Sequence, residues 1–306
     1  MLQSSNSSYN DFDHTPRLEC SRQHDQDTVS VRTVVSIQIL HHDKVSDMRP
    51  PDELVQLSIR LAKPERDLVI LAEGNTSCRD GSHFWVKASG ASLCDITESG
   101  FVACEFQPLL GAMDREATDL EAQEALTLSC VTSKSPQARP SVEAFMHAWL
   151  LTLPGVHFVG HVHPTAVLAL VCSMDASDLC RMRFFPDEVV CCGPVTAWVP
   201  YIDPGLPLAV KIREVVSNFV RENGEAPKVI WMQNHGLIAL GRTALEVESA
   251  ILMSVKASQM VVLAGGLQAV TKNKLLPLTA ATVERIKSRP DEHYRQELLW
   301  KIGGKD

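Results

Sequence analysis

The chain has 306 residues, 45% of them hydrophobic, so it is long enough and apolar enough to bury a sizeable core. Its formal net charge of −8 provides no basic surface for nucleic acid or for an anionic membrane, and we expect neither as a partner. The nine cysteines are an odd count, no Cys-x-x-Cys pair occurs, and the N-terminus lacks a secretory pattern, which together predict reduced thiols in a cytoplasmic protein.

The first 47 residues differ in composition from the rest of the chain. Residues 1–27 are rich in Ser, Asn, Asp, His and Gln and have almost no apolar periodicity, which predicts disorder. His41 and His42 are interpreted as an ordinary exposed pair rather than a metal site. We predict a disordered extension over residues 1–47, either a tail or an over-extended gene start, and one folded domain over residues 48–306.

From Asp52 onward the pattern becomes regular. Apolar residues recur at helical spacing after Asp52, the expected N-cap of this helix. A short buried strand is predicted over Leu68–Ala72, and a turn-rich segment, Glu73–Arg79, follows it. A second strand, Phe84–Gly90, is expected to pair with the first as a hairpin, so that the polar turns at their ends lie near one another. A helix over Asp114–Leu128, with its first residue as N-cap, comes next.

The segment Arg139-Pro-Ser-Val-Glu143 has the features of a helix start. Ser141 is the expected N-cap. Glu143 then falls in the first turn, where its carboxylate points toward whatever lies at the helix N-terminus. His147 follows one helical turn later on the same face and is interpreted as a packing or supporting residue rather than a metal ligand.

Two histidines end the next apolar run, Phe158–Pro164. Side chains alternate along a strand, so His161 and His163 point to the same face. Both imidazoles can then reach one ion at roughly 2.0–2.1 Å. His235 ends another apolar run and is followed by glycine. These residues predict a three-histidine metal site with open positions for a substrate.

The remaining segments alternate between short strands and helices. The expected elements are a short helix over Thr165–Cys172, two strands within Val189–Val199, an amphipathic helix over Leu206–Asn223, a buried strand over Val229–Gln233, a long helix over Ala244–Ala264, and a charged, mostly helical tail over Thr279–Glu297 with a break at Pro290. The longest apolar stretch is interrupted by Lys256 and Gln259, so we predict no membrane span. The pattern indicates a single α/β domain whose central sheet is mostly antiparallel or mixed and is flanked by helices.

Five short motifs occur in a fixed order along the chain. They are Gly74-Asn75-Thr76-Ser77, Lys87-Ala-Ser89-Gly90, Pro140-Ser141-Val142-Glu143 with His147, His161-Val-His163-Pro164 and Asn234-His235-Gly236. Together they resemble the class II aldolase/adducin family over about residues 52–299. Residues 85–90 and 139–149 look most like the aldolase part of rhamnulose-1-phosphate aldolase/alcohol dehydrogenase fusions, although this chain is too short to hold the dehydrogenase half.

The resemblance implies a zinc-dependent lyase of carbohydrate metabolism that acts on a sugar phosphate. His161, His163 and His235 match the ligands of Zn²⁺ or another divalent metal, which would polarise the ketose carbonyl and stabilise the enediolate left by retro-aldol cleavage. Glu143 matches the catalytic acid/base residue. The phosphate would bind on small polar turns, which correspond to Asn75, Ser89, Gly90 and Ser141, with Lys87 as a further cation. A homotetramer is also implied.

The resemblance leaves alternatives open. A serine frequent in the family is replaced by Val142, which removes one phosphate-binding hydroxyl, and Lys87 either compensates for it or reads a carboxylate. The same metal and acid/base groups suit a sugar-phosphate 4-epimerase or a sugar-acid phosphate decarboxylase. A non-catalytic, adducin-like assembly module is the alternative of a different class, but this chain keeps the three histidines and the glutamate. Tyr201 is interpreted as structural, and Tyr294 as a candidate late acid/base group from a neighbouring subunit.

Overall fold

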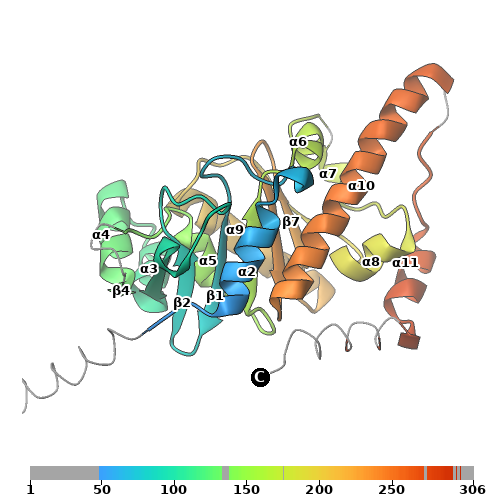
Figure 1. Cartoon of the computed structure of the whole chain (residues 1–306). Helices are drawn as coiled ribbons and strands as arrows, with labels where there is room; N and C mark the ends of the chain where they lie inside the picture. Colours follow the sequence, from blue (N-terminus) through green and yellow to red (C-terminus); the bar gives the residue numbers. More distant parts are fainter. Residues whose placement is uncertain are drawn as a thin grey trace, which may run out of the picture. The chain divides into compact units, whose positions relative to one another are not determined.

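The computed structural model describes residues 48–132, 138–174, 176–271 and 274–291, together with residues 294 and 297. The extension predicted over residues 1–47 lies outside these described residues, as does most of the predicted tail after Asp291. Figure 1 shows the chain coloured along the sequence.

A mixed sheet of eight strands forms the centre of the described part of the chain, in the order β4-β3-β2-β1-β5-β8-β7-β6. Neighbouring strands are antiparallel except β6 and β7, which run parallel. The strands are β1 Asn75–Asp80, β2 His83–Lys87, β3 Phe101–Glu105, β4 Cys130–Thr132, β5 Phe158–Val162, β6 Ala197–Val199, β7 Val229–Met232 and β8 Gly236–Gly241. The predicted mixed α/β architecture is confirmed.

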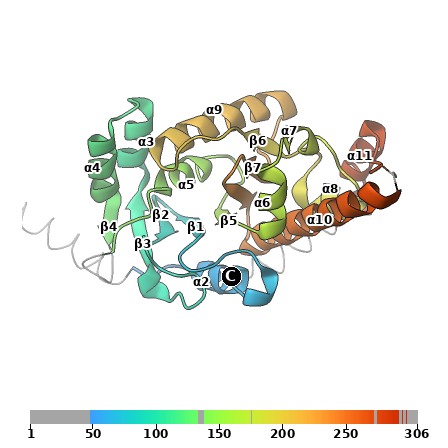
Figure 2. The ribbon, with the colours of Figure 1, turned by 90° about the horizontal axis from the view of Figure 1, so that it is seen from above.

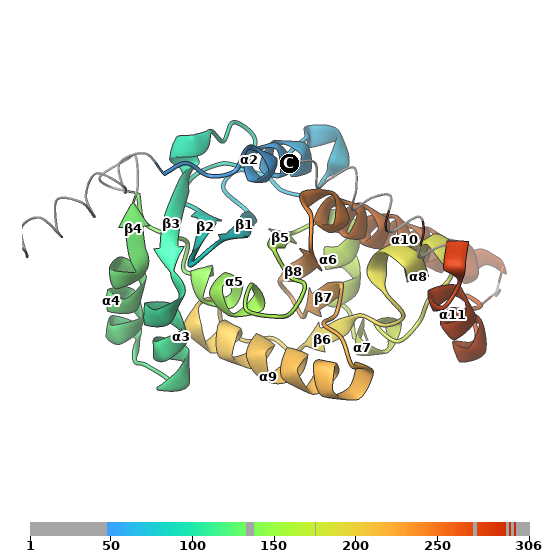
Figure 3. The ribbon, with the colours of Figure 1, turned by 90° about the horizontal axis from the view of Figure 1, so that it is seen from below.

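Helices cover both faces of this sheet. The α-helices are α2 Asp52–Leu61, α3 Phe106–Asp114, α4 Asp119–Ser129, α5 Ala144–Leu150, α6 Thr165–Val171, α7 Ala176–Leu179, α8 Pro186–Cys192, α9 Leu206–Asn223, α10 Ala244–Thr271 and α11 Ala280–Lys287, and the 3-10 helices are η1 Pro64–Arg66 and η2 Glu98–Gly100. Figures 2 and 3 show α3, α5 and α9 along one side of the sheet and α2 and α10 along the other. Each side has its own apolar core cluster, built from side chains that alternate along the strands.

The strand register brings three of the polar motifs, those that begin at Gly74, Lys87 and Pro140, to one end of the sheet. Asn75, the first residue of β1, lies opposite His161 of β5. An isolated bridge between Ala88, which follows β2, and Pro140 places the segment before α5 beside the end of β2. The β7–β8 turn contributes His235 to the same end, because β8 pairs with β5.

The predicted strand over Leu68–Ala72 is wrong. This segment is a loop in which Leu68 is buried but Ile70 and Leu71 are 63% and 85% exposed. Glu73 closes a tight turn, since its backbone N–H donates to the Ile70 carbonyl and its carboxylate accepts from the Ile70 N–H. The strand instead occupies the segment predicted to be turn-rich, because β1 has partners on both sides that outweigh its turn propensity.

Two other predicted elements need correction. The helix expected over Asp114–Leu128 begins later than predicted. Asp114 is the last residue of α3, and α4 begins after Thr118, whose side chain forms a capping box with Glu121. One of the two strands expected within Val189–Val199 is the helix α8, which ends at Gly193 (φ 78°), and only β6 is a strand. The strands β3, β4 and β8 had not been predicted at all.

The predicted caps also shift by one or two residues. Asp52 is the first residue of α2, and Pro51 is its N-cap. Glu143 is the N-cap of α5, not a first-turn residue. Ser141 lies two residues earlier, and its hydroxyl accepts a hydrogen bond from the Glu143 N–H. The expected helix over Leu206–Asn223 has the predicted bounds.

The long helix α10 extends further than predicted. By length and composition, its residues 244–268 would suffice to cross a membrane, and 33% of the 18-residue apolar window within them is buried. Ala244, Val247, Ile251 and Val255 belong to the core cluster on the α10 side of the sheet. Glu248, also on α10, forms ion pairs with Arg60 and Arg66 at 2.6 Å. We therefore interpret the N-terminal part of α10 as a core helix.

Candidate metal centre and active site

The three histidines predicted as metal ligands come together at one end of the sheet. One ring nitrogen from each of His161, His163 and His235 lies within 4.8 Å of the others. His161 is in β5, His163 follows the end of β5, and His235 lies in the turn between β7 and β8. The Nε2 atoms of His161 and His163 are 2.9 Å apart. The set of donors fits Zn²⁺, which prefers imidazole nitrogens and keeps an open position in catalytic sites.

The backbone around the histidines fixes their orientation. The Nδ1–H of the fully buried His161 donates to the Leu237 carbonyl at 2.9 Å, which leaves the Nε2 lone pair directed at the other histidines. A Cβ added to Gly236 would lie 2.6 Å from the Val162 carbonyl oxygen and 2.8 Å from the His163 ring. Only glycine therefore fits between the strand end and the histidines, which explains the His-Gly sequence.

The pKa values of His161 and His163 are displaced in the direction that metal binding needs. Burial lowers the pKa of His161 to about 4 and that of His163 to about 3. For His163 the neighbouring imidazoles add to the effect of burial. Both rings are therefore neutral at pH 7, and neutral imidazole is the form that binds a metal ion.

Glu143 lies against the histidines. Its Oε1 atom is 3.2 Å from His235 Nε2 and 3.6 Å from His161 Nε2, and its Oε2 atom accepts a hydrogen bond from Asn75 Nδ2. Burial raises the pKa of Glu143, but His161 and the hydrogen bonds from His235 and Asn75 outweigh burial and hold the pKa well below its usual range. The site thus contains one ionised carboxylate beside the neutral imidazoles of His161 and His163.

Asn75 is engaged on both sides of its amide. Besides the bond to Glu143, its Oδ1 atom forms a hydrogen bond with His147 Nε2, and His147 Nδ1 lies 2.6 Å from Ser77 Oγ. His147 is fully buried and lies outside the cluster of three histidines. Burial lowers its pKa to about 4. The Asn75 side chain thus links Glu143 to His147, and its predicted role in binding phosphate stays a prediction.

Lys87 connects the loop before β1 to the turn after β2 through its buried side chain. Its ammonium group donates to the carbonyl oxygens of Ala72 and Ala91, both at 2.7 Å, and only 3% of the residue is exposed. Burial lowers the pKa of Lys87, and the negative charge of Glu143 opposes this shift. Lys87 is therefore neither a solvated charge at a strand end nor an exposed anion ligand. It fixes the positions of the turns and places a positive charge below them.

The other residues predicted to bind phosphate lie at the edge of the site. Ser89 and Gly90 are exposed, and Ser141 is half-buried. The Ser89 N–H donates to the Arg139 carbonyl and the Ser141 N–H to the Lys87 carbonyl, so these two groups are already used. Within the described part of the chain, no hydrogen-bond partner is found for the N–H groups of Gly90 and Val142. The side chain of Val142 is 50% exposed.

Sequence reasoning missed two residues that touch this constellation. Glu73 Oε1 lies 3.7 Å from His163 Nδ1, and Ser77 contacts His147. Both belong to the segment 73–79, which was predicted to be a loop; the alternation of Asn75 and Ser77 along one strand face would have been the signal for Ser77. Tyr201 is half-exposed and its hydroxyl donates to Asp203, consistent with the structural role expected for it.

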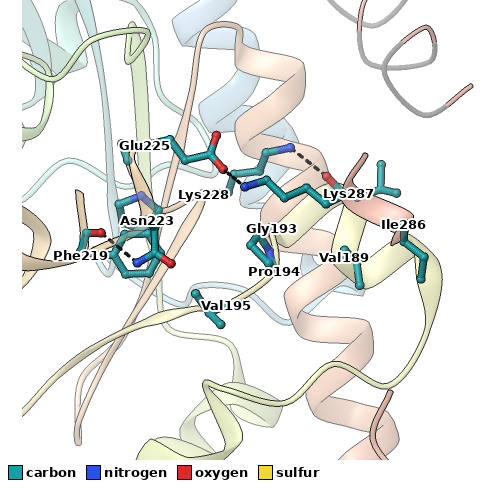
Figure 4. A pocket seen from close by; sticks show the side chains of 13 residues that line it. Val189, Gly193, Pro194, Val195, Phe219, Asn223, Glu225, Lys228, Ile286 and Lys287 are labelled. Carbon is teal, nitrogen blue, oxygen red and sulfur yellow. Dashed lines mark hydrogen bonds and ion pairs between the residues drawn. The ribbon is translucent and has the colours of Figure 1, made fainter. Parts of the chain in front are cut away.

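A separate cleft lies away from the histidines, at the opposite end of β7. Figure 4 shows its lining, which comes from α8, α9, α11 and the loop before β7. Its volume is about 120 Å³, and an ion pair between Lys287 and Glu225 (2.8 Å) crosses one side. None of the predicted site residues lines this cleft.

Comparison with known proteins places the chain in a family. Residues 52–262 match the model of the class II aldolase and adducin N-terminal domain. A search of curated proteins returned no match. The N-terminal class II aldolase domain of a conserved protein from Thermoplasma acidophilum is 29% identical and has a TM-score of 0.54, with 69% of this chain and 92% of that chain covered.

Two further solved structures share the fold at lower identity. L-fuculose-1-phosphate aldolase from Thermus thermophilus is 16% identical, with a TM-score of 0.52 and coverage of 74% of this chain and 97% of that chain. YgbL from Klebsiella pneumoniae, for which aldolase, epimerase and decarboxylase activities have been suggested, is 18% identical, with a TM-score of 0.57 and coverage of 77% and 96%. The family-model match spans most of the described chain, and this protein belongs to the class II aldolase and adducin family.

Proposed function

We propose that this protein is a zinc-dependent lyase that cleaves a ketose 1-phosphate, such as rhamnulose- or fuculose-1-phosphate, by a retro-aldol reaction. The products are dihydroxyacetone phosphate and an aldehyde. The observation that carries the proposal is the cluster of three imidazole nitrogens within 4.8 Å, with the Glu143 carboxylate 3.2 Å from one of them. An adducin-like assembly module has no use for such a constellation.

His161, His163 and His235 would hold the metal ion. When bound, a divalent ion supplies Lewis-acid polarisation of the substrate carbonyl and of the oxygens beside it. The contacts of the histidines would support such an ion: the Leu237 carbonyl orients His161, and the Glu73 carboxylate faces His163 Nδ1. Another divalent metal that accepts imidazole ligands would fit the same donors.

Glu143 would move the proton. Retro-aldol cleavage removes a proton from the hydroxyl group on one side of the breaking C–C bond. After the bond breaks, a proton is added to the carbon on the other side, which belongs to the phosphate-bearing product. A base for this work must be ionised before the substrate arrives, and the low pKa of Glu143 satisfies that condition. The position of Glu143 at the start of α5 keeps the carboxylate directed at the histidines.

The substrate phosphate would bind at the rim formed by Ser89, Gly90 and Ser141. The open N–H of Gly90 and the two hydroxyls are donors, and the buried Lys87 ammonium supplies positive charge below them. Val142 would contribute only its backbone N–H, so this phosphate-binding site has one hydroxyl fewer than it would have with a serine at position 142.

We include cytoplasmic location and homo-oligomerisation, as a tetramer, in the proposal. Exposed apolar side chains on the C-terminal part of α10 support the second point, because Leu263, Leu267 and Val270 are 75%, 57% and 84% exposed. In Figure 1 this part of α10 extends beyond the helices that surround its N-terminal part.

The proposal is tested first by metal content. Elemental analysis of protein purified without a histidine tag should find about one zinc, or another divalent ion, per chain, and His163→Ala should lose it while remaining folded. The control is His157→Ala, which removes a histidine outside the cluster and should leave the metal content unchanged. Folded protein that is free of metal and does not take up added zinc would contradict the proposal and favour an assembly module.

Product analysis then separates the reactions that the family shares. A lyase converts one ketose 1-phosphate into two smaller products. A 4-epimerase conserves the mass of its substrate, and a decarboxylase releases CO₂ from a sugar acid. Cleavage of rhamnulose- or fuculose-1-phosphate into two products is the outcome that the proposal requires.

A further inference from the structure

A chain of four polar side chains runs from the interior to the metal centre: Ser77, His147, Asn75 and Glu143. The first three are almost fully buried, with exposed fractions of 0%, 0% and 3%. Asn75 and Ser77 project from the same face of β1, and His147 and Glu143 lie one helical turn apart at the start of α5. These hydrogen-bonded side chains therefore connect β1 to α5 directly behind the histidine cluster.

Chemistry fixes the direction of every hydrogen bond in this chain. The Asn75 amide presents its Nδ2 group to Glu143 Oε2 and its Oδ1 atom to His147 Nε2, so Asn75 donates to the carboxylate. Since Oδ1 can only accept, His147 must carry its proton on Nε2. The neutral ring then has a lone pair on Nδ1, and the Ser77 hydroxyl donates to it at 2.6 Å.

We infer that His147 and Asn75 are positioning residues for Glu143. The hydrogen bond from Asn75 occupies Glu143 Oε2. The other oxygen, Oε1, is the one that faces His235 and His161, so the chain selects Oε1 as the oxygen that exchanges a proton with the substrate. This inference rests on the proposed function, because it assigns the oxygen at which that reaction takes place.

The donor on His147 is the part of the chain that can be removed most selectively. Without it, Asn75 Oδ1 loses its partner in a buried site, and a flipped amide would present Oδ1 to the Glu143 carboxylate, which repels it. Glutamine can replace the donor of His147, since its side-chain amide carries N–H groups, whereas methionine has nearly the same size and no donor. The pair His147→Gln and His147→Met therefore isolates the hydrogen bond from the packing.

The expected result concerns kcat rather than binding. His147→Met should lower kcat for ketose 1-phosphate cleavage by roughly 10- to 100-fold, because a misplaced catalytic group loses about this much. KM and the metal content should stay at wild-type values, and His147→Gln should recover most of the lost kcat. Equal kcat values for the two variants would overturn the inference, and so would a selective rise in KM for phosphorylated substrates in His147→Met.

Thr76→Val is the matched control for a lost buried hydrogen bond. Thr76 lies between Asn75 and Ser77 on the opposite face of β1, where its hydroxyl bonds to Ser58 at 2.6 Å. This variant should lose stability without a change in kcat. If Thr76→Val lowered kcat as much as His147→Met, general loosening of β1 would explain both effects and the inference would fall.

A spectroscopic measurement tests the inference without substrate. In protein with ¹⁵N-labelled histidine, the His147 ring should show a protonated Nε2 and an unprotonated Nδ1 at pH 7, and Ser77→Ala should shift the Nδ1 signal. A proton on Nδ1, or a charged ring, would reverse the direction of the chain and overturn the inference. Failure of the wild-type protein to cleave any ketose 1-phosphate would instead count against the proposed function, and the ring tautomer would still be decided.

Discussion

Glu143 has a charge state that only its environment explains. A carboxylate this buried would ordinarily be neutralised, but hydrogen bonds from Asn75 and His235 keep it ionised. The same surroundings keep His161 and His163 neutral. A base and a set of metal ligands thus coexist within a few ångströms, and substitutions can address them separately.

Glu143→Gln should separate the two functions. The amide keeps the size of the side chain and removes the base, so we expect zinc content near the wild-type value and a fall in kcat of roughly 100-fold or more. Elemental analysis and a coupled assay of dihydroxyacetone phosphate formation give the two readouts. Full activity in this variant would refute the acid/base assignment, and lost zinc would instead make Glu143 a determinant of metal binding.

His147 should make the stability of the protein depend on pH. Burial lowers its pKa from 6.5 to about 4, so the unfolded chain binds this proton more readily than the folded chain. The stabilising contribution of neutral His147 to the free energy of unfolding is fully present above pH 6.5 and is lost as the pH falls toward 4. Between pH 7 and pH 5 the free energy of unfolding should fall by roughly 2 kcal/mol more in the wild type than in His147→Gln.

Urea unfolding in the presence of a chelator measures this difference. Chelation removes zinc release from the comparison, and the other histidines are common to both proteins. Parallel pH dependences for wild type and His147→Gln would mean that His147 titrates normally in the folded chain.

At the scale of elements, β5 is positioned by its contact with α10. A Cβ on Gly160 would lie 2.7 Å from Val247 Cγ1 and 3.1 Å from Ile251 Cδ1. Val247 is branched and buried, so it has little freedom to move away. Gly160→Ala should therefore lower the free energy of unfolding by roughly 1–3 kcal/mol, and because His161 is the next residue, it should also weaken zinc binding.

Gly265→Ala is the control for this prediction. Gly265 is an exposed residue inside α10, and a Cβ there would meet no heavy atom within 4 Å. The substitution should leave zinc binding unchanged and should be neutral or stabilising by up to roughly 1 kcal/mol. Thermal unfolding and competition with a zinc indicator measure both effects. Equal behaviour of the two variants would show that the contact between β5 and α10 is loose.

At the scale of the whole molecule, the boundary near Met48 is open to a direct test. Met48 packs against the core cluster formed by α2 and strands β1–β3, and the family match begins at Asp52. A chain that starts at Met48 should therefore fold, bind zinc and turn over substrate as the full chain does. Circular dichroism, metal analysis and kcat provide the comparison with the full-length protein. Lost solubility of the shorter chain would show that residues 1–47 pack on the domain.

The sequence by itself identified the three histidines and the glutamate that the structure brings together. His161, His163, His235 and Glu143 could be chosen because their chemistry and local context are encoded within a few residues of each. Amphipathic helices such as α9 were predictable for the same reason, since a period of 3.6 residues is a local signal. The mixed α/β architecture follows from the alternation of such segments.

Only the tertiary structure decided which polar residues serve the substrate and which serve the protein. The segment 75–80 has turn-forming residues, but pairing with β2 and β5 makes it a strand and directs Asn75 and Ser77 toward His147. Lys87 is buried against two carbonyl groups from turns on either side of it. These arrangements depend on strand register and on contacts between distant segments, and the free energy of such contacts is absent from any local stretch of sequence.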